Sequence, residues 1–186
     1  MARCFLLLLC LLLAAVPFLV SSASENECVY TIYIRTGFVI KAGTDATIGL
    51  SLGDAAGREF VVPDLVAWGG LMGVQHDYYE RGALDAFSGR GPCGLDAPLC
   101  RLNLTSDGAG NHHGWYCEYV EVTVTGPHVP CAQTLFYVRQ WLATDAPPYQ
   151  LYATVDGCTQ PDEVGHRRLV VGNGTQELEN PSLSSS

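Results

Sequence analysis

The chain has 186 residues, of which 48 % are hydrophobic, and it carries 10 lysines and arginines against 19 aspartates and glutamates. A formal net charge of −9 argues against a nucleic-acid-binding protein, because such proteins present a basic surface. It argues equally against attachment to anionic membranes through charge alone.

The first 23 residues have the pattern of a secretory signal peptide. Arg3 supplies a short positive region, an almost unbroken apolar run covers residues 5–20, and small residues follow at 21–23. We expect cleavage after Ala23. The alternative is a membrane anchor, because the run approaches the lower limit of about 17 residues for a span. The later segments are too polar to cross a bilayer, so we expect that the mature chain does not span a membrane. We also expect the mature chain to be a monomer.

Segments rich in β-branched and aromatic residues follow one another along the mature chain and predict strands. We expect eight strands, over residues 28–35, 45–52, 58–62, 83–88, 99–105, 115–125, 133–142 and 149–155. The second of them alternates strictly, so one of its faces should be buried and the other wet. Eight short strands separated by turns predict an all-β antiparallel sandwich over residues 24–158. Residues 159–186 contain little apolar side chain to bury and are predicted to be a flexible tail.

One turn has an unusual composition. Between Gly37 and Gly43 the chain places Phe38, Val39 and Ile40 in a row, although surface loops are normally polar. We hypothesise that these three side chains contact a membrane lipid or a protein partner. The alternative is that they pack on their own domain. A further candidate contact comes from the glycine-rich connection over residues 64–82, where Trp68 is of the type that favours membrane interfaces.

Six cysteines remain after the expected cleavage, at positions 28, 93, 100, 117, 131 and 158. An even number in a secreted chain predicts disulfides. Cys93 and Cys100 flank a short loop and are predicted to form a local pair. Cys28 opens the first strand and Cys158 follows the last, so these two should pair if the strands are antiparallel neighbours. Cys117 is left with Cys131, and their pairing stays open; a zinc site is disfavoured because no Cys-x-x-Cys occurs.

Two sequons agree with a secretory destination. They predict N-glycosylation at Asn103 and Asn173.

Four blocks, in order along the chain, resemble the PLAT domain, which is also called the lipoxygenase homology domain. They are Thr36-Gly37 with Ala42-Gly43-Thr44-Asp45-Ala46, then Glu80-Arg81-Gly82-Ala83-Leu84-Asp85-Ala86-Phe87, then Gly114-Trp115-Tyr116 with Val120-Glu121-Val122, and finally Trp141-Leu142. The resemblance covers roughly residues 28–155. The cysteines, the leader and the block over residues 66–70 are similar to the plant single-domain PLAT and embryo-specific-protein group.

The resemblance implies two four-stranded sheets and a non-catalytic module that binds membranes or partner proteins. In lipoxygenases and lipases the domain accompanies an enzyme, and in lipoxygenase-type relatives an apolar residue at the position of Ile40 enters the bilayer. The plant group is associated with stress responses and with the endoplasmic reticulum. We therefore expect a protein of the endoplasmic reticulum lumen or of the extracellular space, including the apoplast.

Some PLAT domains bind calcium through acidic loops at one end of the sandwich. Here Asp45 and Asp107 lie in loops that are expected to converge, with Asn111 nearby, and calcium takes such oxygen ligands. The alternative is that Asp45 caps a turn by accepting backbone hydrogen bonds. His112 and His113, which follow Asp107 closely in the sequence, raise the question of catalysis, but no catalytic motif accompanies them. We predict that the protein is not an enzyme.

Overall fold

The computed structural model describes residues 27–127, 129–158 and 168–171. The described elements are β1 (Glu27–Thr36), β2 (Ile48–Gly53), β3 (Glu59–Val62), α2 (Leu65–Gly69), β4 (Leu84–Pro92), β5 (Arg101–Ser106), β6 (Trp115–Gly126), β7 (Val129–Leu142), β8 (Tyr152–Asp156) and β9 (Arg168–Val171). The predicted signal peptide, the sequon at Asn173 and all of the predicted tail except β9 lie outside the described residues.

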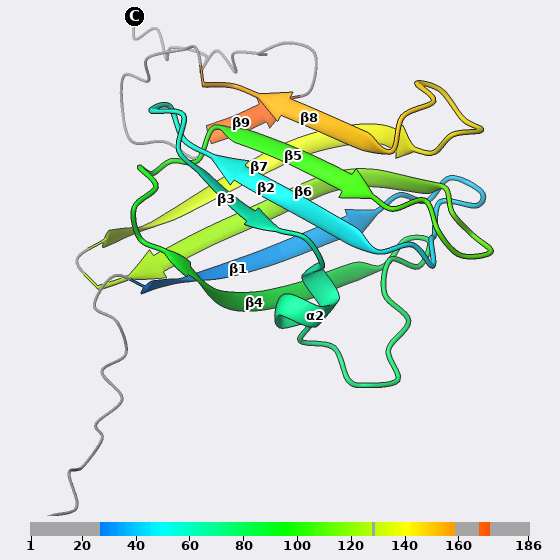
Figure 1. Ribbon diagram of the computed structural model, residues 1–186, viewed down its shortest axis with the longest axis horizontal. Helices are drawn as coiled ribbons and strands as arrows, with labels where there is room; N and C mark the ends of the chain where they lie inside the picture. The colour runs from blue at the N-terminus through cyan, green and yellow to red at the C-terminus, as the bar shows by residue number, and fades with distance from the viewer. Residues whose placement is uncertain (1–26, 128, 159–167, 172–186) are drawn as a thin grey trace, which may run out of the picture.

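The strands form two sheets that stack face to face (Figure 1). One has the order β3-β2-β5-β8 and the other β4-β1-β6-β7, with β9 added at its edge. All pairs among β1 to β8 are antiparallel, so the predicted eight-stranded antiparallel sandwich is confirmed. The ninth strand corrects the predicted tail, because Arg168–Val171 pairs in parallel with Thr134–Tyr137 of β7.

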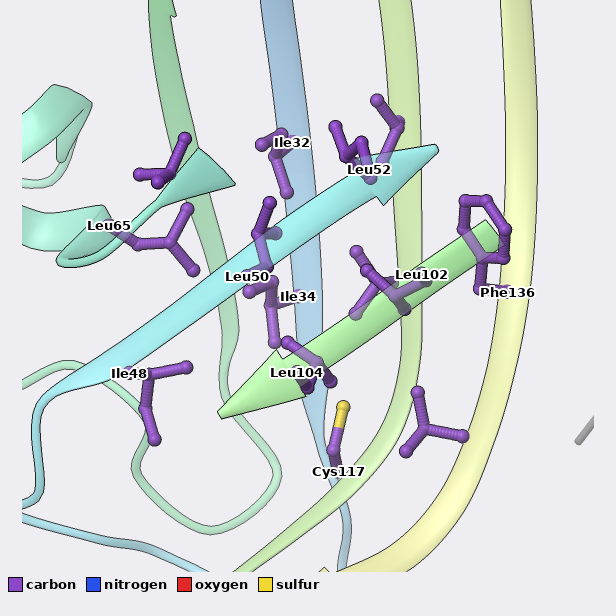
Figure 2. Close-up of a cluster of buried hydrophobic side chains, with 14 of the residues drawn as sticks. Ile32, Ile34, Ile48, Leu50, Leu52, Leu65, Leu102, Leu104, Cys117 and Phe136 are labelled. Carbon is purple, nitrogen blue, oxygen red and sulfur yellow. The ribbon is translucent and has the colours of Figure 1, made fainter. Parts of the chain in front are cut away.

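The core lies between the sheets, where the inward rows of the strands meet. Figure 2 shows Leu50 and Leu104 of the four-stranded sheet packing toward Ile32 and Ile34 of β1. Each of these side chains is essentially buried, and burying one such side chain stabilises the fold by roughly 1.5 to 3 kcal/mol. Alternation of residues along each strand therefore gives each sheet an apolar inner face, and burial of these two faces against each other holds the sandwich together.

The second face of β2 is covered, contrary to the wet face that we predicted. A Cβ on Gly49 would lie 2.7 Å from the carbonyl oxygen of Pro63, so the following segment crosses directly over this glycine. Ser51 Oγ donates a hydrogen bond to Glu59 at 2.9 Å. Only Asp45 and Thr47, which precede β2, are exposed as expected.

A short helix interrupts the long connection between β3 and β4. Helix α2 is capped by Asp64, whose carboxylate accepts from the Ala67 amide at 3.0 Å. The connection after the helix is held by the buried Asp85, which accepts from the Tyr79 amide at 2.8 Å and lies 2.7 Å from His76 Nε2. This explains why an irregular segment rich in aromatics packs closely on the sandwich.

The disulfides join different cysteines from those that we predicted. The observed bonds are Cys28–Cys93 and Cys100–Cys158, so the pairs Cys93–Cys100 and Cys28–Cys158 are wrong. The strand registers give the reason. Cys28 and Cys93 lie where β1 and β4 are paired, whereas Cys100 and Cys158 lie where β5 and β8 are paired. The predicted partners belong to opposite sheets.

Strand direction separates the molecule into two ends. Both disulfides lie at the end where β1 begins and β8 finishes. The other end carries the connections 37–47, 107–114 and 143–151, which extend beyond the sheets at the right of Figure 1. We call the latter the loop end, and it holds the residues considered next.

Candidate functional site

The turn from Gly37 to Gly43, hereafter the tip loop, presents its apolar side chains to solvent. Phe38 is 70 % exposed, Val39 43 % and Ile40 80 %. The alternative of packing on their own domain fails for Ile40, whereas Phe38 keeps a contact with its own domain at Gly82. Apolar side chains of this size are normally placed where they can leave water, so their exposure here is unusual.

Backbone hydrogen bonds hold the tip loop in place on both sides. The Gly37 amide donates to Tyr116 O at 2.9 Å, and the Tyr116 amide donates to Ala42 O at 3.0 Å. Gly37 O in turn accepts from the Gly82 amide at 3.0 Å. At the base of the loop, the buried Trp115 indole donates to Thr36 Oγ1 at 3.0 Å. The apolar residues are thus carried on an ordered support.

Basic side chains surround the apolar tip although the whole chain is acidic. The Arg35 guanidinium lies over the Phe38 ring, 4.8 Å from its centroid, in a cation–π arrangement. Lys41 is exposed directly after Ile40, and Arg81 is exposed on the segment whose backbone approaches Gly43. The local surface therefore combines apolar and cationic groups.

A pocket of about 450 Å³ opens beside the tip loop. Ile40 and Lys41 form one wall, His113 and Asp145 come from the other two connections at this end, and Trp141 comes from the end of β7. The remaining lining residues are Gly43, Asn111, His112, Gly114 and Ala146. Three loops that are far apart in the sequence thus converge on one hollow.

The two histidines of the pocket each face a carboxylate. His112 Nδ1 lies 3.1 Å from Asp45 Oδ2, and the His112 amide donates to the same oxygen at 3.1 Å. His113 Nε2 lies 3.6 Å from Asp145 Oδ1. Both carboxylates are other residues than Asp107, so the grouping of the histidines with Asp107 that the sequence suggested is not the arrangement in the fold.

The acidic residues proposed for calcium serve backbone turns. Asp107 Oδ1 accepts from the amides of Thr47 at 3.0 Å and Ala109 at 2.9 Å. These hydrogen bonds hold the pKa of Asp107 below its ordinary value, and the bond from the Ala109 amide has the largest effect. Asp45 caps the turn around His112 as described above. Within the described ranges, no group of three or more histidine, cysteine, aspartate or glutamate residues is arranged to hold a metal ion.

Trp68 is placed far from the tip loop. Its indole packs over Gly89, where an added Cβ would lie 2.4 Å from Trp68 Cε2, and its ring meets Phe60 edge-on at 6.1 Å. The indole N–H donates to Arg90 O at 3.4 Å. Trp68 therefore fastens α2 to the middle of β4, half-buried, and does not share a surface with Ile40.

Asn103 lies on the outer side of β5. Its amide oxygen accepts from Thr154 Oγ1 at 3.1 Å on the neighbouring strand. The side chain is half-buried. A glycan at this sequon would stand on the broad outer face of the four-stranded sheet.

The two cysteines that remain free lie in different surroundings. Cys117 is buried on the inner face of β6, where burial raises the pKa of its thiol well above the ordinary value. Cys131 is exposed on β7. Cys117 thus serves as a small apolar core residue, which answers the question that the sequence left open.

Sequence reasoning named most of the residues that line the pocket but did not bring them together as one site. Trp141 was noted only within a sequence block, and Lys41 and Asp145 were not singled out at all. The one available signal was the order of the blocks, since residues 36–46, 114–116 and 141–142 all flank loops at the same end of the sandwich.

The sequence profile of the family described as Embryo-specific protein 3 (ATS3) matches residues 16–145, more than half of the chain. The chain belongs to this family. It is also 51 % identical over 148 residues to PLAT domain-containing protein 1 of Arabidopsis thaliana, covering 80 % of this chain and 81 % of that one. Identity to PLAT domain-containing protein 3 of the same plant is 58 % over 105 residues, covering 56 % of this chain and 100 % of that one. The predicted resemblance to plant PLAT proteins is confirmed.

The fold recurs in larger proteins. A crystal structure of a LOX variant superposes with a TM-score of 0.51 at 19 % identity, covering 70 % of this chain and 16 % of that one. At this identity the likeness shows the fold alone. A relative in Mus musculus, Lipoxygenase homology domain-containing protein 1, is 30 % identical over 121 residues, covering 61 % of this chain and 5 % of that one.

Proposed function

We propose that this PLAT-domain protein is a non-catalytic module of the secretory pathway that docks reversibly on membranes through its tip loop. The observation that carries the proposal is the exposure of Phe38 and Ile40 on a loop fixed by hydrogen bonds. Among the described residues no helix has the length and apolar character needed to cross a bilayer. We extend the proposal to stress physiology, with which the resembling plant group is associated.

The expected strength of docking follows from the size of the tip. Burying each large apolar side chain contributes roughly 1.5 to 3 kcal/mol, so Phe38 and Ile40 together contribute about 3 to 6 kcal/mol. Dissociation constants of about 1 mM and 1 μM correspond to 4.1 and 8.2 kcal/mol. Attachment by the tip alone is therefore weak and reversible. Because the loop is already ordered, little conformational entropy is lost on docking.

The charge around the tip suits the interfacial layer of a membrane. Arg35 and Lys41 lie beside the apolar side chains, at the depth where lipid phosphates would be found once Ile40 enters the acyl region. Each such cation adds about 1 kcal/mol near an anionic surface.

The disulfides support the secretory part of the proposal. Cys28–Cys93 and Cys100–Cys158 are bonds of the kind that persist in oxidising compartments and are rare in the cytosol. The endoplasmic reticulum lumen and the extracellular space both satisfy this condition.

Liposome flotation tests the proposal. Wild type should float with phosphatidylcholine vesicles, and Ile40→Asp should lose most of that binding. Val74→Asp is the matched control, because Val74 is likewise an exposed apolar residue but lies in the connection after α2. Equal flotation of wild type and Ile40→Asp, or equal loss in both variants, would overturn docking by the tip loop.

The same assay separates the alternative functions. Asp45 and Asp107 are occupied by backbone hydrogen bonds, so we expect the same flotation in calcium and in chelator. Binding that requires calcium would instead support a calcium-dependent lipid module. A tip that binds no vesicle but captures a protein partner, with capture abolished by Ile40→Asp, would support an adaptor without lipid affinity.

A further inference from the structure

The pocket at the loop end shares a residue with the proposed membrane contact. Ile40 is at once the most exposed of the three tip residues and part of the pocket wall. When Ile40 enters a bilayer, the pocket wall that Ile40 forms is therefore brought to the membrane surface. A volume of about 450 Å³ falls within the roughly 300 to 1,000 Å³ of small-ligand sites.

We propose that this pocket binds the neutral sugar headgroup of a glycolipid in the membrane on which the protein docks. The inference rests on the proposed docking function and names the class of lipid. It is carried by the chemistry of the lining, by its charge balance and by its preformed geometry.

The lining combines an aromatic surface with hydrogen-bonding groups. Trp141 is half-buried and is braced by Tyr116, whose ring meets it edge-on at 5.5 Å. A pyranose has an apolar C–H face that packs on an indole, and a rim of hydroxyl groups that donate and accept hydrogen bonds. Asp145 can accept from such hydroxyls, and Asn111 and His113 can donate or accept. All three lie in the pocket wall with Trp141.

The charges of the lining favour a neutral ligand over an anionic one. Lys41 is balanced by Asp145 within the wall. His112 and His113 are each placed against a carboxylate, at 3.1 and 3.6 Å. A phosphate group would meet no excess of positive charge here, in a chain of net charge −9. Hydroxyl groups pair with cationic, anionic and neutral partners alike and fit this mixture.

Hydrogen bonds between the loops fix the shape of the pocket. Thr44 Oγ1 donates to His112 O at 2.6 Å, and the Asp45 amide donates to the same oxygen at 3.0 Å, so the two loops are tied together. Gly114 keeps the floor open, since a Cβ there would lie 3.2 Å from Ala143 Cβ and 3.7 Å from Asp145 Oδ1. A preformed site binds without the cost of ordering its loops.

Vesicle binding with two lipid compositions tests the inference on the full mature chain. Wild type should bind phosphatidylcholine vesicles that contain galactosyldiacylglycerol about tenfold more tightly than phosphatidylcholine alone, the gain of one or two hydrogen bonds and a ring contact. Asp145→Ala and Asn111→Ala should remove this gain and keep the binding to phosphatidylcholine. Asp77→Ala, an exposed aspartate outside the pocket, is the matched control and should behave as wild type.

The outcomes separate the two proposals. Equal binding of wild type to both compositions, or a gain that survives in both pocket variants, overturns the sugar site and leaves tip docking intact. Loss of all vesicle binding in wild type overturns tip docking. In that case, shifts of the Trp141 indole NMR signal on adding methyl galactoside decide the site alone, and their absence overturns it. A gain on phosphatidic acid vesicles that exceeds the galactolipid gain and is lost in Asn111→Ala overturns the choice of a neutral headgroup, because the tip-loop cations would raise binding to an anionic vesicle in wild type and variant alike.

Discussion

The ring of Phe38 lies directly on Gly82, where an added Cβ would stand 2.7 Å from Phe38 Cε1. Gly82 also has a φ of +74°, which favours glycine over residues that bear a side chain. The segment just before β4 is thus shaped to receive the tip loop. One side of the exposed Phe38 ring therefore packs against Gly82.

Substitution of Gly82 should therefore lower the free energy of unfolding by more than backbone strain alone would, because the new side chain also displaces Phe38. Gly82→Ala should lower the free energy of unfolding by about 2 kcal/mol, combining the left-handed conformation with displacement of Phe38. Gly57→Ala is the control, because Gly57 has a φ of +80° and nothing within 4 Å of an added Cβ; it should lose about 1 kcal/mol. Urea unfolding measures both, and equal losses would show that the Phe38 contact contributes nothing.

Two buried tyrosines should respond in opposite ways to loss of the hydroxyl. Tyr30 Oη donates to Pro92 O at 2.6 Å, so Tyr30→Phe should cost about 1 kcal/mol. Tyr79 Oη is buried and has no hydrogen-bond partner within the described part of the chain. Tyr79→Phe should therefore be neutral or slightly stabilising. Thermal unfolding of the two variants decides the point, and a large loss in Tyr79→Phe would reveal a partner for that hydroxyl.

Asp54 should make the fold sensitive to acid. Burial would raise the pKa of this carboxyl, but hydrogen bonds from the Asp96 and Arg58 amides and from the Arg58 guanidinium outweigh burial and hold the pKa below its ordinary value. A carboxyl with a depressed pKa stabilises the fold above its unfolded pKa, about 3.9 for aspartate. That stability is lost as the pH falls through the folded pKa.

We expect Asp54→Asn to lower the free energy of unfolding by about 2 kcal/mol at neutral pH, since it removes a charged acceptor of several hydrogen bonds. The difference from wild type should shrink below about pH 4. Urea midpoints recorded against pH for the two proteins measure it. A difference that stays constant down to pH 2 would contradict the role of the charge.

The cysteines give a covalent check on the fold. Peptide mapping under non-reducing conditions should recover Cys28 linked to Cys93, and Cys100 linked to Cys158. Differential alkylation of the native protein should label Cys131, which is exposed, and leave Cys117 unlabelled until the protein is denatured. Rapid labelling of Cys117 in the native state would mean that the inner face of β6 is open to solvent.

The strands were predictable because their period-two pattern is local to each segment. Leu50 and Leu104 show their inward direction from their immediate neighbours alone. The tip loop was predictable for a related reason, since three apolar residues between two glycines break the alternation. The short strand β9 was not predictable, because Arg168–Val171 stands in a polar stretch and is defined by its pairing with β7.

The disulfides and the pocket depend on relationships that no local pattern contains. Sequence proximity suggested that Cys93 would pair with Cys100, yet β4 and β5 belong to different sheets. Similarly, Asp107 is closer in the sequence to His112, but Asp45 is the carboxylate that reaches it. Both outcomes follow from strand order and register, which place distant segments beside one another.

Each disulfide fastens strand ends within a single sheet, and neither of them crosses from one sheet to the other. Packing of the two sheets against each other therefore relies on the apolar core, since no disulfide among the described residues links one sheet to the other. Weakening that interior, for example at Phe136 or Leu104, should let the layers part while every cross-link stays intact. The two disulfides can thus stay oxidised while the two sheets separate.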